Sequence, residues 1–248
     1  MIKPQLVAHR GYPEHYPENT LVGIEAAIRA GARLIEVDVQ LSADEVPVLF
    51  HDRSLTRVCG VKGTVHHMRF DQLRALHPSE FERFGYRFAH VQIPSLAEFR
   101  DLLEAHPGVT AFVELKQSSL AHFGPAVVLN RVLRELTSVA QQIVLISFSL
   151  ETLLAARRQG LTNLGAVLQQ WSQRKQVIVQ EIKPDYVICD VDRLPRWGRL
   201  RVSATKLMVY EVTDPKLALA LASRGIDYVE TFAIGEMFER LELLEAAP

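Results

Sequence analysis

Residues 34–39 have the sequence Leu-Ile-Glu-Val-Asp-Val, and they give the clearest indication of the fold. In this run apolar residues alternate with carboxylates, and β-branched residues are frequent, which is typical of a β-strand. Because successive side chains of a strand point to opposite faces, Glu36 and Asp38 share one face and the apolar residues share the other. A strand of an α/β barrel would turn its apolar face to the surrounding helices and the two carboxylates inward. An edge strand with a solvated acidic face fits the same residues equally well.

Similar short apolar runs recur along the chain and alternate with segments of helical pattern. Together with the run above, they predict strands at residues 5–9, 34–39, 111–115, 142–147, 163–168, 185–189, 206–212 and 226–230. This alternation indicates a parallel sheet of βα units, and eight strands are the number that closes a barrel. The sequence therefore predicts an α/β fold, a (β/α)8 TIM barrel. Residues 1–248 would form one domain, since such barrels commonly reach about 250 residues.

Two of the helices between these strands have recognisable ends. Asn19 or Thr20 can cap a helix that Gly31 then ends. Ser95 and Glu98 form a capping-box pattern at the start of a second helix. Both helices lie where a βα unit requires one, which supports the barrel.

The second and third predicted strands are separated by about seventy residues, more than a single helix requires. We therefore expect a small insertion between the second strand and the second helix, at approximately residues 41–93. Its first part predicts a hairpin that turns at residues 43–45 and returns as a strand over residues 46–50. A strand that returns in this way would bring His51 back to the mouth of the barrel.

The overall composition excludes several classes of protein. The chain has 248 residues, and 28 Lys plus Arg against 29 Asp plus Glu leave a net charge of −1, which excludes a polybasic nucleic-acid or membrane-surface binder. Its only cysteines, Cys59 and Cys189, are too few for a disulfide framework and fit a reducing compartment. We find neither a signal peptide nor an apolar run long enough to span a membrane, and we expect a cytoplasmic protein without stable membrane association.

A third carboxylate strengthens the inward orientation of the first two. Residues 111–116 read Ala-Phe-Val-Glu-Leu-Lys, a strand that ends with Glu114 and Lys116 on one face. Glu36, Asp38 and Glu114 would then supply hard oxygen ligands, which suit Mg²⁺ or Ca²⁺ better than Zn²⁺. Lys116 either holds a phosphate or forms a salt bridge with Glu114.

Two histidines and an arginine are expected near the same place. The first predicted strand ends in His9-Arg10-Gly11, and His51 ends the returning strand of the hairpin. Two imidazoles can divide general-acid and general-base duties, although a single histidine at a strand end more often has a structural role. The guanidinium of Arg10 offers a planar fork for an anion. These residues alone predict a metal-assisted enzyme that acts on a phosphate, and no more specific reaction.

Five short motifs, in this order, carry a resemblance to a known family: His9-Arg10-Gly11, Pro17-Glu18-Asn19-Thr20-Leu21, Ile35-Glu36-Val37-Asp38-Val39, His51-Asp52 and Val113-Glu114-Leu115-Lys116. The chain resembles the glycerophosphodiester phosphodiesterase family. The resemblance covers most of the chain, because residues 93–96 and 146–148 also resemble family segments.

The resemblance implies a barrel hydrolase that cleaves glycerophosphodiesters, such as glycerophosphocholine or glycerophosphoethanolamine, to sn-glycerol 3-phosphate and an alcohol. It implies Glu36, Asp38 and Glu114 as ligands of one divalent cation, Mg²⁺ or Ca²⁺, His9 and His51 as the acid-base pair, Arg10 and Lys116 as phosphate contacts, and Tyr210 as an aromatic wall for the glycerol. The choice of cation, the preferred head group and the separate duties of the two histidines stay open. So does the choice between attack by water and attack by the substrate's own hydroxyl through a cyclic phosphate.

Two segments depart from the pattern that the family usually shows. Residues 210–213 read Tyr-Glu-Val-Thr in place of Trp-Thr-Val-Asn, and residues 231–234 read Thr-Phe-Ala-Ile in place of Thr-Asp-x-Pro. We expect these changes to affect which alcohol the site accepts. The pair His66-His67 lies in the insertion, where the family places no histidine pair, and we expect it to be a solvated surface pair.

Two alternative functions keep the barrel. One is a phospholipase of the sphingomyelinase D type, a lyase-like enzyme that would need an apolar membrane-facing loop, whereas the aromatic residues at 81–89 are interspersed with charges. The other is a barrel that binds a phosphorylated ligand without catalysis, which the presence of every catalytic-type residue disfavours. In each case the partner is a small molecule rather than a nucleic acid. The oligomeric state stays open, a homo-oligomer included.

Overall fold

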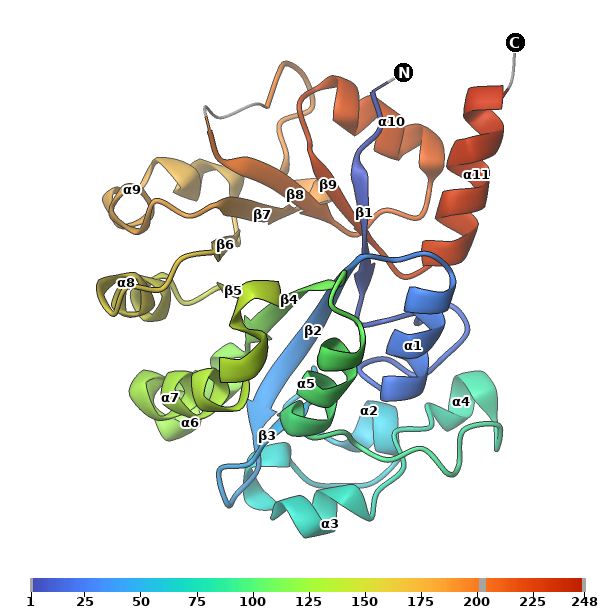
Figure 1. Ribbon diagram of the computed structural model, residues 1–248, viewed down its shortest axis with the longest axis vertical. Coiled ribbons are helices and arrows are strands. Elements are labelled where there is room, and N and C mark those ends of the chain that lie inside the picture. The colour runs from blue at the N-terminus through green and yellow to red at the C-terminus, as the bar shows by residue number, and fades with distance from the viewer. Residues whose placement is uncertain (1, 201–203, 247–248) are drawn as a thin grey trace.

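The computed structural model describes residues 2–200 and 204–246. Eight parallel strands form a closed barrel: β1 (Gln5–His9), β2 (Leu34–Leu41), β4 (Thr110–Leu115), β5 (Ile143–Ser147), β6 (Leu164–Leu168), β7 (Tyr186–Asp190), β8 (Lys206–Tyr210) and β9 (Tyr228–Thr231). Each pairs with its neighbours, and β1 pairs with both β9 and β2, which closes the ring (Figure 1). The predicted (β/α)8 barrel is therefore confirmed.

The predicted strands agree with the observed ones to within two residues at each end. The largest differences, of two residues, are at β2, which ends at Leu41 rather than at residue 39, at β8, which ends at Tyr210 rather than at residue 212, and at β9, which begins at Tyr228 rather than at residue 226. The ladder between β7 and β8 stops where Asp190 pairs with Tyr210. Glu211 therefore lies in the loop that follows the strand, at the mouth of the barrel.

Helices surround the sheet on the outside (Figure 1). They are α1 (Leu21–Arg29), α5 (Leu96–Ala105), α6 (Gln117–Phe123), α7 (Pro125–Glu135), α8 (Leu150–Arg158), α9 (Val177–Ile182), α10 (Pro215–Ser223) and α11 (Ile234–Ala246), with short 3-10 helices η2 (Thr137–Gln142), η3 (Trp171–Lys175) and η4 (Val191–Arg193). The hydroxyl of Thr20 accepts from the backbone of Gly23, and Ser95 forms a capping box with Glu98, so both predicted helix starts are confirmed. The described helices include none with the length and hydropathy that crossing a bilayer requires.

Two apolar layers hold the barrel together. Ile35, Val37 and Val39 are fully buried in the layer between the strands and the helices, as the alternation predicts. Inside the barrel, the ring of Phe112 packs edge-on against Tyr186, and Tyr186 packs against Tyr228. Because these two tyrosines are the first residues of their strands, the aromatic rings fill the amino-terminal end of the barrel. The charged inward side chains lie toward the carboxyl-terminal end.

The chain between β2 and α5 folds at one edge of the barrel, at the bottom of Figure 1. It contains β3 (Pro47–Leu49), α2 (Thr56–Cys59), η1 (Val65–His67), α3 (Phe70–Arg74) and α4 (Phe81–Phe84). β3 runs antiparallel to β2, with Val39 opposite Leu49 and Leu41 opposite Pro47, so the predicted hairpin is present. A small hydrophobic cluster of its own, including Val48 and Phe50, holds this region together.

One prediction for this region is wrong. His67 is exposed, but His66 is only 2% exposed, so the two do not form a solvated pair. Val65 packs into the hydrophobic cluster, and the 3-10 turn that follows directs His66 toward β2. There its Nε2 lies 2.9 Å from Oε1 of Gln40, and its ring lies 5.0 Å from that of His122.

We expect His66 to make the stability of the protein depend on pH. Burial, followed by the nearby charge of His122, lowers the pKa of His66 from 6.5 to about 4. Because the unfolded chain takes up a proton near pH 6.5 and the folded chain does so only near pH 4, stability should be retained above pH 6.5 and fall as the pH decreases toward 4. His66→Gln, which keeps a donor for Gln40, should reduce this fall by about 1–3 kcal/mol in urea unfolding at pH 7 and pH 4.5. An equal pH dependence in the variant would contradict the assignment.

Candidate active site

The polar side chains of the barrel gather at the carboxyl-terminal ends of the strands. A cavity of about 110 Å³ opens there. Its lining is charged on one side and apolar on the other, with residues His9, Arg10, Glu36, His51, Glu114, Lys116, Ile146, Phe148, Val167, Ile188, Tyr210 and Glu230. All the site residues predicted from the sequence except Asp38 line it directly, and Asp38 contacts two of them, Arg10 and Lys116.

Three carboxylates meet at the charged side of the cavity. Asp38 on β2 is the register partner of Glu114 on β4, and Glu36 lies one inward position below Asp38. One oxygen from each of the three lies within 4.8 Å of the others. Glu36 and Asp38 are each 1% exposed, so the solvated edge-strand alternative is wrong. The inward orientation follows from the two-residue period of the strands.

The electrostatics of this triad fit a bound cation. Burial, together with the charges of Asp38 and Glu230, raises the pKa of Glu36 well above its ordinary value, and burial also raises the pKa of Glu114. Among the described residues, Oε1 of Glu36 has no hydrogen-bond partner although it is buried. Buried carboxylates that repel one another require a compensating positive charge. The three oxygen donors therefore fit a hard divalent cation such as Mg²⁺ or Ca²⁺.

Two cations border the triad. The Nζ of Lys116 lies 3.0 Å from a carboxylate oxygen of Asp38 and 3.0 Å from one of Glu114, and Nε of Arg10 lies 3.2 Å from Asp38. Although burial alone would raise it, these two cations hold the pKa of Asp38 well below its usual range. Lys116 thus forms the predicted ion pair with Glu114 and still lines the cavity, where its charge is available to an anion.

The two predicted histidines both line the cavity but differ in exposure and neighbours. His9 is buried, and its Nε2 lies 3.6 Å from Glu36. His51 is more exposed, and its Nδ1 lies 2.7 Å from Oδ1 of Asp52. Burial is the main cause that lowers the pKa of both imidazoles. Both are therefore neutral near pH 7 and able to accept a proton.

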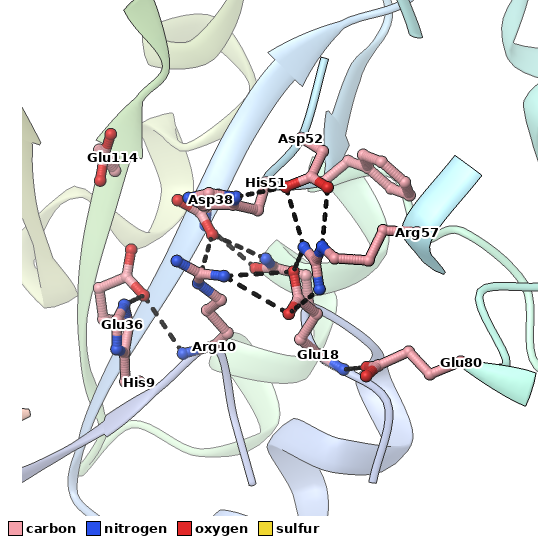
Figure 2. A network of polar contacts seen from close by, with 12 residues as sticks. His9, Arg10, Glu18, Glu36, Asp38, His51, Asp52, Arg57, Glu80 and Glu114 are labelled. Carbon is pink, nitrogen blue, oxygen red and sulfur yellow. Dashed lines mark hydrogen bonds and ion pairs between the residues drawn. The ribbon is translucent and has the colours of Figure 1, made fainter. Parts of the chain in front are cut away.

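An ion-pair network behind His51 escaped the sequence analysis. Arg57, on α2, donates to both Asp52 and Glu18, and Glu18 also pairs with Arg10 (Figure 2). Asp52 follows His51 directly, and Glu18 belongs to a quoted motif, but nothing in the sequence around Arg57 indicates its partners. Glu18, His51 and Asp52 also lie close enough together to hold a metal ion. However, the guanidinium of Arg57 forms ion pairs with both carboxylates and already neutralises their charge. The network holds His51 in place.

Two further carboxylates lie near His9: Glu230 was missed, and Glu211 was expected only to affect the choice of alcohol. Glu230, an inward residue of β9, is 2% exposed and lines the cavity, and no hydrogen-bond partner for its Oε1 exists in the part of the chain that the structure describes. The alternation of Tyr228, Glu230 and Phe232 could have revealed it. Glu211 lies 3.2 Å from Nδ1 of His9, and burial raises the pKa of Glu211 to about 8.

Comparisons with known proteins agree on one family. A model of the glycerophosphoryl diester phosphodiesterase family matches residues 9–192. Glycerophosphodiester phosphodiesterase from Caldanaerobacter subterraneus is 25% identical over 191 residues, which are 75% of this chain and 77% of that protein. Rat glycerophosphodiester phosphodiesterase 1 is 36% identical over 110 residues, 44% of this chain and 33% of that protein. The matches span only a third to a half of the rat and bovine proteins.

Solved structures show the same fold. A phosphodiesterase from Oleispira antarctica, determined in complex with the product sn-glycerol-3-phosphate, superposes with a TM-score of 0.85 at 22% identity and 97% coverage of both chains. A glycerophosphodiester phosphodiesterase from Agrobacterium tumefaciens superposes with a TM-score of 0.75 at 24% identity, covering 94% of this chain and 98% of its own. The barrel fold thus recurs over nearly the whole length of both proteins.

Proposed function

The chain belongs to the glycerophosphoryl diester phosphodiesterase family, and on this premise we propose that it hydrolyses glycerophosphodiesters to sn-glycerol 3-phosphate and an alcohol. The observation that carries the proposal is the meeting of three carboxylates, two cations and two histidines at one cavity. The Oleispira structure, which holds sn-glycerol-3-phosphate, supports the same chemistry. A diester of this kind is small enough to place its phosphate and glycerol at the mouth of the barrel.

Glu36, Asp38 and Glu114 would hold one divalent cation, Mg²⁺ or Ca²⁺. When bound, the cation supplies Lewis-acid stabilisation for charge that develops on the phosphoryl oxygens. Its charge also offsets the repulsion among the three buried carboxylates.

Arg10 and Lys116 would bind the phosphate. Both already contact Asp38, so their charges lie next to the three carboxylates that would hold the cation. The guanidinium offers two parallel donors, and the ammonium offers a point charge. Donors that are fixed before the reaction stabilise the charge of the transition state without a reorganisation cost. The apolar side of the cavity, which includes Phe148 and Tyr210, would contact the glycerol carbons.

His9 and His51 would divide the proton transfers. One imidazole takes the proton of the nucleophile, and the other donates a proton to the departing alkoxide. The two imidazoles have separate partners, Glu36 and Glu211 for His9 and Asp52 for His51, so each can take a different duty. Asp52 orients His51 through Nδ1, which leaves Nε2 free to exchange a proton with the substrate.

The test measures release of glycerol 3-phosphate from glycerophosphocholine and glycerophosphoethanolamine by the purified protein. Turnover should stop in EDTA and return when Mg²⁺ or Ca²⁺ is added back. Phosphorus NMR of the products would reveal a cyclic phosphate if the glycerol hydroxyl is the nucleophile. Undiminished turnover in EDTA would contradict the metal site. Binding of glycerol 3-phosphate without turnover of either diester would support the non-catalytic alternative instead.

A further inference from the structure

Both departures from the family pattern meet at one side chain, that of His9. Glu211 directly follows β8, and Phe232 directly follows β9. Oε2 of Glu211 lies 3.2 Å from Nδ1 of His9, and the ring of Phe232 stacks on the imidazole with centroids 4.8 Å apart and planes 17° apart. The two departures also contact each other, because the backbone N–H of Phe232 donates to Oε1 of Glu211 at 3.2 Å.

These contacts fix the imidazole in two independent ways. The stacked phenyl ring restricts tilting of the imidazole plane, and the contact at Nδ1 restricts rotation within that plane. The second ring nitrogen, Nε2, is thereby directed toward Glu36 and Glu230, whose nearest oxygens lie 3.6 and 3.8 Å away. Nε2 thus faces the cavity.

We propose that Glu211 is a positioning residue that holds His9 with the proton on Nδ1 and the free lone pair of Nε2 at the cavity. The effect on the reaction rate rests on the proposed function, whereas the state of His9 does not. A neutral imidazole carries one N–H, and that N–H goes to the better acceptor. Among the described carboxylates around His9, only Glu211 lies within hydrogen-bonding distance, since both carboxylates near Nε2 are farther than 3.5 Å.

Burial raises the pKa of Glu211 to about 8, so the carboxylate that accepts from Nδ1 predominates above that pH. The N–H of Phe232 donates to its other oxygen, and Arg10 stabilises its negative charge, so both act against the burial that raises the pKa of Glu211. When Nε2 takes a proton from the nucleophile, His9 becomes an imidazolium with two N–H groups. The carboxylate of Glu211 then stabilises that charge, as a carboxylate does behind other catalytic histidines.

Two variants separate positioning from simple structural support. Glu211→Gln keeps an oxygen that can accept from Nδ1, whereas Glu211→Thr introduces the residue of the family pattern and removes that contact. Glu151→Gln, at an exposed position on α8, is the matched control. The first readout is the ¹⁵N NMR signal of His9 in histidine-labelled protein, assigned by its loss in His9→Asn, because nitrogen shifts distinguish the two tautomers. The second is kcat and KM for glycerophosphoethanolamine in the presence of the divalent cation.

Above pH 8, where Glu211 is ionised, we expect the Nδ1–H tautomer in the wild type and in Glu211→Gln, and a mixture of tautomers in Glu211→Thr. We also expect kcat to fall about tenfold or more in Glu211→Thr with KM within about twofold, and to recover partly in Glu211→Gln. An Nε2–H tautomer in the wild type would overturn the proposal, and so would a loss of kcat without a change of tautomer. If the wild type does not turn over the diester, the proposed function fails, but the tautomer of His9 still decides whether Glu211 positions it.

Discussion

Glu36→Gln should abolish the turnover of glycerophosphodiesters and leave the metal-free protein at least as stable as the wild type. Glu36 is buried beside Asp38 and Glu230, and its pKa is raised by that burial and by their charges. Charge at this position therefore costs free energy of folding unless a cation offsets it. Glutamine removes the charge with little change of volume, so the function should be lost without loss of the fold.

The measurement compares wild type, Glu36→Gln and the control Glu151→Gln. With Mg²⁺ or Ca²⁺, the wild type and the control should show a rise in Tm that Glu36→Gln lacks. Turnover should fall by a factor of about 10³ or more, since a bound cation supplies several kcal/mol of transition-state stabilisation. Activity near that of the wild type, or an unchanged metal-induced rise in Tm, would rule out Glu36 as a ligand. Glu114→Gln should behave in the same way.

His51→Ala should reduce kcat by about 10²–10⁴-fold with little effect on the fold or on the metal. The imidazole is held by Asp52 and by the ion pairs of Arg57, and it lines the cavity from the side of the β3 hairpin. Its removal takes away one proton-transfer group and leaves the three carboxylates in place.

The matched comparison is Asp52→Asn, which retains the imidazole but weakens its orientation. We expect this variant to lose less activity than His51→Ala, and both variants to keep the metal-induced rise in Tm. Addition of imidazole to His51→Ala should restore part of the rate, because the space left by the side chain opens to solvent. Equal activity of His51→Ala and the wild type would exclude a proton-transfer role for His51.

The barrel and the three carboxylates could be predicted from the sequence because both depend on local periodicity. A two-residue alternation places Glu36 and Asp38 on one face whatever the rest of the chain does. The strand that carries Glu114 repeats the same pattern, and parallel strands align their carboxyl-terminal ends. These inferences need no knowledge of which loop lies above which strand.

The contacts of Arg57, Glu211 and His66 could not be predicted in this way. Each joins segments far apart in the chain: Arg57 reaches Glu18, Glu211 reaches His9, and His66 reaches Gln40. Such contacts depend on how the loops fold over the barrel, which no short pattern records. Glu230 is the exception, because the alternation along β9 already directs it inward.

The closure of the barrel is a late event in the synthesis of the chain. Two register pairs join β1 to β2, Ala8 with Ile35 and His9 with Glu36, and the other edge of β1 pairs with β9, where Gln5 lies opposite Tyr228. During synthesis, His9 therefore leaves the ribosome long before β9, the strand that pairs with the other edge of β1. Until β9 emerges, β1 lacks one neighbour and His9 lacks the residues that follow β8 and β9. A chain that ends before β9 therefore has an open barrel in which His9 lacks the stacking contact of Phe232.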